Sequence, residues 1–174
     1  YTDKELRRID QFLMKENKGL ILYASAVNMK ASDPKFATTL STHNLEKLLA
    51  GYGVDMKKDA VLDFGRSLRF ATQTQGAPVW ITQPAIVQAQ TTLGADAKEQ
   101  TLDTSFPGFF RIDELSFPFP SSLEVRPEKQ SGAKVQVLAR SSADAISDES
   151  AGLELGLKKE WKPKGARAQR ILAV

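Results

Sequence analysis

The first apolar pattern in the chain is typical of an amphipathic helix. Apolar side chains recur every three or four residues from Leu6 to Leu13, a spacing that places them on one helical face. Thr2 and Glu5 are spaced as a capping box, in which each side chain accepts a hydrogen bond from the other residue's backbone amide. Asn17 and Gly19 follow as stop signals, so the pattern predicts a helix near the start of the chain.

A second helical pattern lies further along the chain. Ser41 or Thr42 can cap it, and Gly51 and Gly53 are suited to end it. The apolar residues that share its predicted face are Leu45, Leu48, Leu49 and Tyr52. This segment is therefore expected to be a short helix with one buried side.

Short apolar runs between these helices and after them predict buried strands. The runs occupy residues 20–24, 60–64, 79–82, 134–139 and 170–174. Runs that are apolar throughout are common in strands covered on both faces, and their alternation with helices favours a largely parallel sheet. We therefore expect a single α/β domain over residues 1–174, with a mainly parallel sheet covered by helices.

The segment from Phe106 to Pro120 is rich in phenylalanine and proline. Proline has no backbone N–H to donate, so this segment cannot be a central strand and is expected to be an edge strand or an irregular extended arm. Its phenylalanines either cover one face of the sheet, which we favour, or form an exposed patch for a partner. A homodimer through this arm is possible on the second interpretation.

Composition excludes several kinds of chemistry. The 174 residues include no cysteine and one histidine, His43. Thiol nucleophiles, cysteine-ligated zinc, iron–sulfur clusters and multi-histidine metal sites are therefore excluded. Asp144, Asp148 and Glu149 lack the spacing of a calcium loop and are interpreted as a solvated turn. We expect no metal and no cofactor.

Basic residues are concentrated near the end of the chain. Residues 158–170 contain six basic residues and one acid, a net charge of +5. Because the whole chain carries +3, everything outside this segment has a net charge of −2. Lysines around Trp161 could neutralise phosphates while the indole stacks on a base, so a nucleic-acid-binding module is one alternative. A solvated loop is the favoured interpretation, followed by contact with anionic lipid or a partner protein.

Polar residues directly after the predicted strands are the candidate binding residues, because ligands of parallel sheets bind at the carboxyl ends of strands. The candidates are Asn28, Asp63, Arg66, Ser141, Ser142 and Asp144. Turn and capping roles are the commoner explanation for such residues. We name them as weak ligand-binding candidates.

An unrecognised hydrolase is the alternative that uses the same residues. Ser141 or Ser142 would be its nucleophile, His43 its base, and Asp63 or Asp144 the acid that orients the histidine. The sequence has no GxSxG turn to present a serine, and it also lacks both a phosphate-binding P-loop and a GxGxxG motif. The chain is therefore expected not to be an enzyme.

Several segments in order resemble one protein family. They are Thr2–Leu6 and Gly19–Leu22; Asn44–Leu49 with Tyr52–Val54 and Ala60–Asp63; Pro78–Trp80; Phe106–Pro107; Pro120–Leu123; and Lys164–Ala166 before Ile171–Val174. This order, which spans nearly the whole chain, resembles the soluble domain of ABC-type transport auxiliary proteins, including those associated with gliding motility. The resemblance implies a flavodoxin-like, three-layer sandwich of the class I glutamine amidotransferase type. Amidotransferase activity needs a cysteine nucleophile, so that activity does not carry over.

The resemblance also implies a cellular setting. Members of that family hold this domain at the extracytoplasmic (periplasmic) face of the membrane through transmembrane segments that this sequence does not contain. The chain, which starts at Tyr1, is therefore expected to be a soluble fragment of a longer membrane-anchored protein. Its expected partners are the membrane permease and ATP-binding subunits of an ABC transporter. The expected role is a non-catalytic accessory or ligand- or partner-binding domain.

Overall fold

The computed structural model describes residues 1–15, 18–30, 32–73, 78–91, 100–129, 134–157 and 160–174. Its α-helices are α1 (Asp3–Leu13) and α2 (Leu45–Gly51), and its 3-10 helices are η1 (Pro107–Phe109) and η2 (Pro127–Lys129). The strands are β1 (Val27–Met29), β2 (Thr38–Leu40), β3 (Val54–Met56), β4 (Ala60–Asp63), β5 (Ser67–Gln73), β6 (Pro78–Gln90), β7 (Glu114–Pro118), β8 (Leu123–Val125), β9 (Ala139–Arg140), β10 (Ala145–Asp148) and β11 (Ile171–Ala173).

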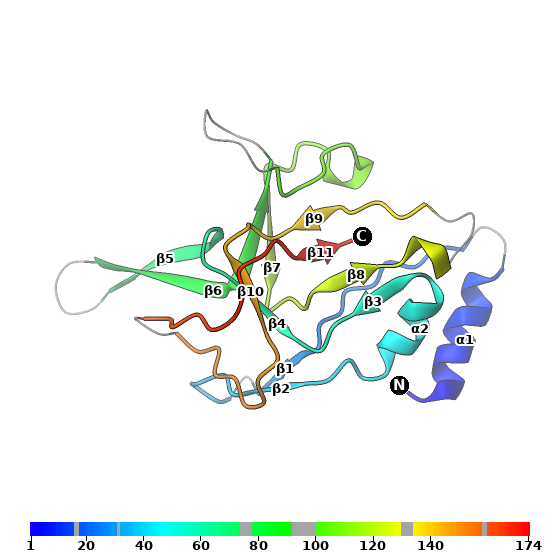
Figure 1. Ribbon diagram of the computed structural model, residues 1–174, viewed down its shortest axis with the longest axis horizontal. Helices are drawn as coiled ribbons and strands as arrows, with labels where there is room; N and C mark the ends of the chain where they lie inside the picture. Colours follow the sequence, from blue (N-terminus) through cyan, green and yellow to red (C-terminus); the bar gives the residue numbers. More distant parts are fainter. Residues whose placement is uncertain (16–17, 31, 74–77, 92–99, 130–133, 158–159) are drawn as a thin grey trace.

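The strands form small antiparallel sheets rather than one parallel sheet. Their orders are β1-β2, β10-β4, β3-β8-β11-β9 and β5-β6-β7, and each of these pairings is antiparallel. Helices α1 and α2 lie together at one end of the molecule (Figure 1). The expected mainly parallel, flavodoxin-like three-layer α/β sandwich is therefore wrong, and the sheets give no support to an amidotransferase-like fold.

The apolar runs predict strands but do not indicate whether neighbouring strands are parallel or antiparallel. A run that is apolar throughout indicates burial on both faces, but burial is compatible with either direction. Parallel neighbours need a crossover connection, usually a helix. Here β4 instead pairs with β10, which is remote in sequence, in an antiparallel register with Leu62 opposite Ile146.

Both predicted helices are confirmed, with one difference at the cap of the second. In α1 the amide of Thr2 donates to Glu5 Oε2 at 2.7 Å, and the amide of Glu5 donates to Thr2 Oγ1 at 3.3 Å. Helix α2 is preceded by Asn44 as its N-cap, with a φ of 67° and no side-chain cap bond, rather than by Ser41 or Thr42. Leu6 of α1 packs with residues of α2 and β3 in one apolar cluster.

Two of the predicted strands are placed differently in the structure. Residues 20–24 form no strand, and their side chains are exposed, with Ile21 at 80% and Tyr23 at 94%. Of residues 134–139, only Ala139 belongs to a strand, β9. The runs at 60–64 and 170–174 form β4 and β11, and the run at 79–82 lies inside the longer β6.

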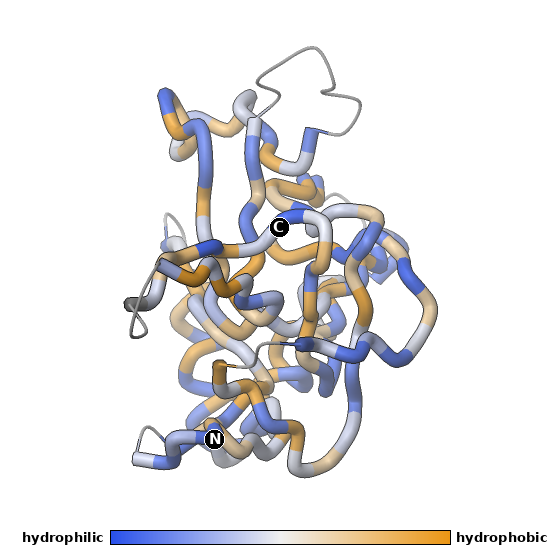
Figure 2. Tube along the Cα trace, turned by 90° about the vertical axis from the view of Figure 1, so that its left-hand side faces the viewer, coloured by the Kyte–Doolittle hydropathy of each residue, from blue (hydrophilic) through white to orange (hydrophobic). Residues whose placement is uncertain are grey.

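The phenylalanine- and proline-rich segment contains an edge strand, as the prolines predicted. It contributes β7, which lies at the edge of the β5-β6-β7 sheet with Pro118 opposite Ile86. Phe109 and Phe117 pack against an apolar cluster that includes Val61 and Val87. Figure 2 shows apolar segments running through the middle of the molecule. These phenylalanines therefore contribute to the core, as we favoured, while Phe110 is exposed.

Candidate functional site

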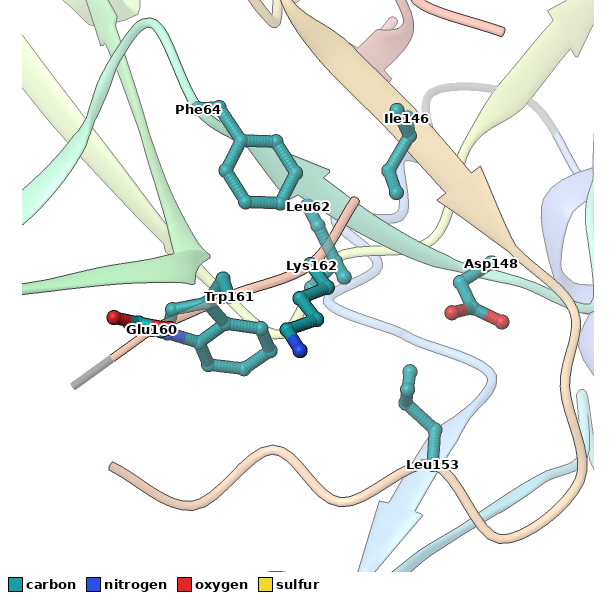
Figure 3. A pocket seen from close by; sticks show the side chains of 8 residues that line it. All are labelled: Leu62, Phe64, Ile146, Asp148, Leu153, Glu160, Trp161 and Lys162. Atoms are coloured by element: carbon teal, nitrogen blue, oxygen red, sulfur yellow. The ribbon is translucent and has the colours of Figure 1, made fainter. Parts of the chain in front are cut away.

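A cavity of about 270 Å³ lies over the β4–β10 pair, and we call it the Trp161 pocket. It is lined by Leu62, Phe64, Ile146, Asp148, Leu153, Glu160, Trp161 and Lys162. Figure 3 shows Phe64 and Trp161 on one side of the pocket, with Asp148 and Leu153 on the other. Three separate parts of the chain thus meet in this pocket: β4 and the residue after it, β10 with the loop that follows, and the basic segment.

The register of β4 and β10 explains the floor of the pocket. Leu62 and Ile146 are direct partners in the antiparallel pair, so their side chains point to the same face. Side chains alternate between faces along a strand, which places Asp148, two residues after Ile146 in β10, on that same face. Phe64, just after the end of β4, packs against the same apolar cluster. Val61 lies on the opposite face and packs into another apolar cluster.

The basic segment was expected to be a solvated loop, and among its described residues the structure bears this out for residues 162–168 but not for Trp161, Gln169 and Arg170, which are half-buried. Lys162 to Ala168 are exposed. Trp161 is only partly exposed and packs against the apolar cluster around Leu62 and Ile146. Its indole therefore packs on the protein and holds this part of the segment across the β4–β10 pair. Lys158 and Lys159 lie outside the described residues.

Charged groups surround the apolar interior of the Trp161 pocket. Asp148 and Glu160 carry carboxylates and Lys162 an ammonium group. Nearby, the guanidinium of Arg167 forms an ion pair with Asp144 at 2.8 Å. In the described part of the chain, no group of three or more histidine and carboxylate side chains could hold a metal ion. The pocket is thus suited to an apolar or aromatic group that carries a polar edge.

Most of the strand-end candidates do come together, but they bind one another. Ser142 donates its amide to Asp63 Oδ2 at 2.7 Å and its hydroxyl to Asp63 Oδ1 at 2.6 Å. The amide of Arg66 donates to Asp63 Oδ1 at 2.9 Å, and the amide of Asp144 donates to Ser142 Oγ at 3.1 Å. Ser141 Oγ donates to the Ser142 carbonyl at 3.0 Å. This network joins the turn after β4 to the turn that precedes β10.

His43 lies in a different network. Its Nε2 is 2.6 Å from Asn28 Oδ1, and its carbonyl accepts a hydrogen bond from the amino terminus of Tyr1 at 2.8 Å. Asn28 is therefore separated from the other strand-end candidates and contacts the histidine instead. Among the hydrogen bonds of the described residues, none joins His43 to Ser141 or Ser142. The chain of hydrogen bonds that a Ser/His/Asp triad requires is not assembled here.

Sequence reasoning missed the Trp161 pocket because its walls are contributed by segments far apart in the chain. Leu62 lies 91 residues before Leu153 and 99 before Trp161, too far for any spacing rule to connect it with them. The available signal was one tryptophan inside a run of lysines. An amphipathic ring in such a run covers apolar surface while its charged neighbours stay in water.

In the ranges that the structure describes, no helix has the length and apolar character needed to cross a membrane. The sequence matches, over residues 1–174, the family described as "ABC-type uncharacterized transport system". Neither the curated proteins nor the solved structures contain a match to the chain.

Proposed function

Since the chain belongs to the ABC-type uncharacterized transport system family, we propose that it is a non-catalytic, partner-binding accessory domain of such a system, working on its extracytoplasmic side. Family membership by itself connects the chain with an ABC-type transport system as an auxiliary component. The binding role and the location are our proposal. The Trp161 pocket is the surface through which we propose that it binds.

The size and lining of the Trp161 pocket carry this proposal. Pockets for whole small molecules commonly enclose roughly 300–1,000 Å³. A volume of about 270 Å³ falls just below that range and suits a single side chain of another protein. Aromatic and aliphatic walls inside a charged rim are also the usual surroundings of a buried anchor at a protein interface. A partner subunit is therefore a better occupant than a free transported molecule.

The serine networks support the non-catalytic part of the proposal. A serine nucleophile needs a base within hydrogen-bond reach of its hydroxyl. Ser142 Oγ donates to Asp63, and Ser141 Oγ donates to a carbonyl while it accepts from the amide of Arg170 at 2.8 Å. Both serines are buried. Their bonds hold the turn after β4 and the turn before β10 together, and both hydroxyls are engaged within this network.

Co-purification with the permease and ATP-binding subunits of the same transport system tests the proposal. We expect the unmodified protein to retain these subunits, Trp161→Ala to lose them, and Trp161→Phe to retain part of the binding. Lys162→Glu changes only the exposed rim, so it tests the pocket without removing a packed ring. Ile21→Ser, a change at an exposed apolar residue outside the pocket, is the matched control, and thermal melting checks that each variant is folded.

Two results would contradict the proposal. One is subunit binding that survives both Trp161→Ala and Lys162→Glu in folded protein, because the pocket would then not be the docking site. The other is saturable hydrolysis of an ester, amide or glycoside that Ser142→Ala or His43→Ala abolishes. That second result would establish the hydrolase alternative.

A further inference from the structure

Strand β5 and the first half of β6 form a two-stranded hairpin that projects from the rest of the molecule (Figure 1). We call residues 67–73 and 78–83 the hairpin arm. Close to the body, β6 is buried at Gln83, Pro84 and Ala85, whereas Pro78, Val79 and Trp80 are exposed. A two-stranded ribbon has little core of its own, so exposed apolar side chains on it call for an explanation by function.

The exposed apolar residues occupy both faces of the hairpin arm. Trp80 lies opposite Ala71 and is 69% exposed, while Val79 lies opposite Thr72 and is 42% exposed. Successive residues of a strand point to opposite faces, so Trp80 and Val79 cannot both be covered by one flat surface. An occupant of this site therefore has to contact both faces of the ribbon.

Arg69 is the one charged residue of the hairpin arm, and it lies in the part nearer the body of the molecule. Arg69 is exposed and pairs with Thr82, which places it on the same face as Trp80 but nearer the body. The Arg69–Thr82 pair and the Ala71–Trp80 pair are two residues apart along the ribbon, a distance of about 7 Å. Beyond Arg69, from Phe70 to Ala95, the sequence contains no charged residue, and residues 67–91 contain no carboxylate.

We propose that the hairpin arm inserts its exposed apolar residues Val79 and Trp80 into the interface of an anionic lipid bilayer. A lipid interface contacts both faces of an inserted ribbon. A flat protein surface would contact only one face. Tryptophan is favoured at the level of the headgroups, and an arginine set back from it is placed to contact lipid phosphates. The absence of carboxylates removes repulsion from an anionic surface. This inference goes beyond the proposed function, because it concerns a surface other than the Trp161 pocket.

Vesicle binding of the whole chain tests the lipid contact. The protein is sedimented with vesicles of equal parts phosphatidylcholine and phosphatidylglycerol, and with vesicles of phosphatidylcholine alone. The Trp161→Phe background leaves Trp80 as the only tryptophan. Its emission should then shift to the blue on the anionic vesicles, and brominated lipid should quench it.

We expect Trp80→Ser to lose most of the vesicle binding. Arg69→Ala should weaken binding to the anionic vesicles by about fivefold, the effect of one basic residue near such a surface. Leu157→Ser replaces an exposed apolar residue outside the hairpin arm and is the matched control, which should bind as the unmodified protein does. Trp80 is exposed, so its replacement should leave the melting temperature unchanged.

Three results would overturn the lipid contact. The first is the absence of binding to either kind of vesicle. The second is anionic binding that Trp80→Ser leaves unchanged, which would assign it to the basic segment at 158–170. The third is a lipid-free dimer, seen by light scattering, that Trp80→Ser dissociates while vesicle binding is absent. The hairpin arm would then be a contact between copies of this chain.

Discussion

Ser142 binds the carboxylate of Asp63 through both its backbone amide and its hydroxyl, at 2.7 and 2.6 Å. Ser122 binds Asp59 in the same way, with its amide at 2.8 Å and its hydroxyl at 2.5 Å. All four side chains are buried. Asp59 precedes β4 and Asp63 ends it, so the two pairs fix both ends of this strand against remote parts of the chain.

Replacing Asp63 by asparagine should destabilise the fold. The Asp63 carboxylate accepts bonds from the amides of Gly65, Arg66 and Ser142 and from the Ser142 hydroxyl. An asparagine NH₂ group would face one of these donors and leave it without a partner in the interior. We expect Asp63→Asn to lower the free energy of unfolding by about 2–3 kcal/mol, measured by denaturant titration.

Ser142→Ala serves as the comparison for that change. It removes one hydroxyl donor but keeps the amide bond to Asp63, so we expect a smaller loss of about 1 kcal/mol. Equal and negligible effects of Asp63→Asn and Ser142→Ala would show that the network does not stabilise the native state.

Gly53 and Gly51 should respond in opposite ways to alanine. Gly53 has a φ of 76°, and a Cβ built there would lie 2.7 Å from the carbonyl oxygen of Arg126. The left-handed conformation alone costs an alanine about 1–2 kcal/mol, and the contact adds to this cost. Gly51 closes α2, and a Cβ there meets nothing within 4 Å.

We therefore expect Gly53→Ala to lower the melting temperature clearly. We expect Gly51→Ala to raise the free energy of unfolding by about 0.5–1 kcal/mol, and with it the melting temperature slightly. The two variants differ by the same single methyl group from the unmodified protein. If Gly53→Ala did not lower stability, the assigned backbone conformation at Gly53 would be wrong, and if Gly51→Ala lowered it, the open space at Gly51 would be wrong.

Burial, rather than apolar character, should decide which leucines and isoleucines stabilise the fold. Leu102 is 1% exposed and belongs to the main apolar cluster, so Leu102→Ala should cost about 2–5 kcal/mol. Ile21 is 80% exposed, and Ile21→Ala should change stability by less than about 0.5 kcal/mol. A large loss for Ile21→Ala would instead favour the buried strand that the sequence predicted at residues 20–24.

Acid should weaken the start of α1. The backbone amide of Thr2 donates a hydrogen bond to the carboxylate of Glu5, and so does the Thr2 hydroxyl. These bonds, the amide bond most of all, hold the pKa of Glu5 below its ordinary value of 4.5. A lowered pKa means that the native state favours the charged carboxylate. Its contribution to stability is present above pH 4.5 and is lost as the pH falls through the lowered pKa.

Glu5→Gln keeps an acceptor oxygen but does not titrate, so it isolates this effect. We expect the unmodified protein to melt at a slightly higher temperature than Glu5→Gln at neutral pH, with the difference closing in acid. High salt should reduce the difference, because Glu5 is exposed. A difference that is constant with pH would mean that the charge on Glu5 does not contribute to the cap.

Local patterns in the sequence were enough to place some elements and to suggest which residues would meet. The capping box at Thr2 and Glu5 predicted the start of α1, because both partners lie within one helical turn. Prolines in the segment ending at Pro120 predicted an edge strand, because a proline amide cannot enter a central ladder. Asp63 and Ser142 were both named as strand-end residues, and the structure brings them into contact.

Direction, pairing and exposure required the tertiary structure. The run at residues 20–24 looks as apolar as the run that became β4, yet only β4 found a partner strand, β10, and two apolar faces to cover it. The Trp161 pocket arises only when β4, the loop after β10 and the basic segment meet. The sequence by itself determined the two helices, the edge strand and the exclusion of cysteine chemistry, because each depends on neighbouring residues or on composition. Tertiary structure decided the antiparallel sheets, the pocket and the projecting hairpin arm, because these depend on contacts between residues far apart in the chain.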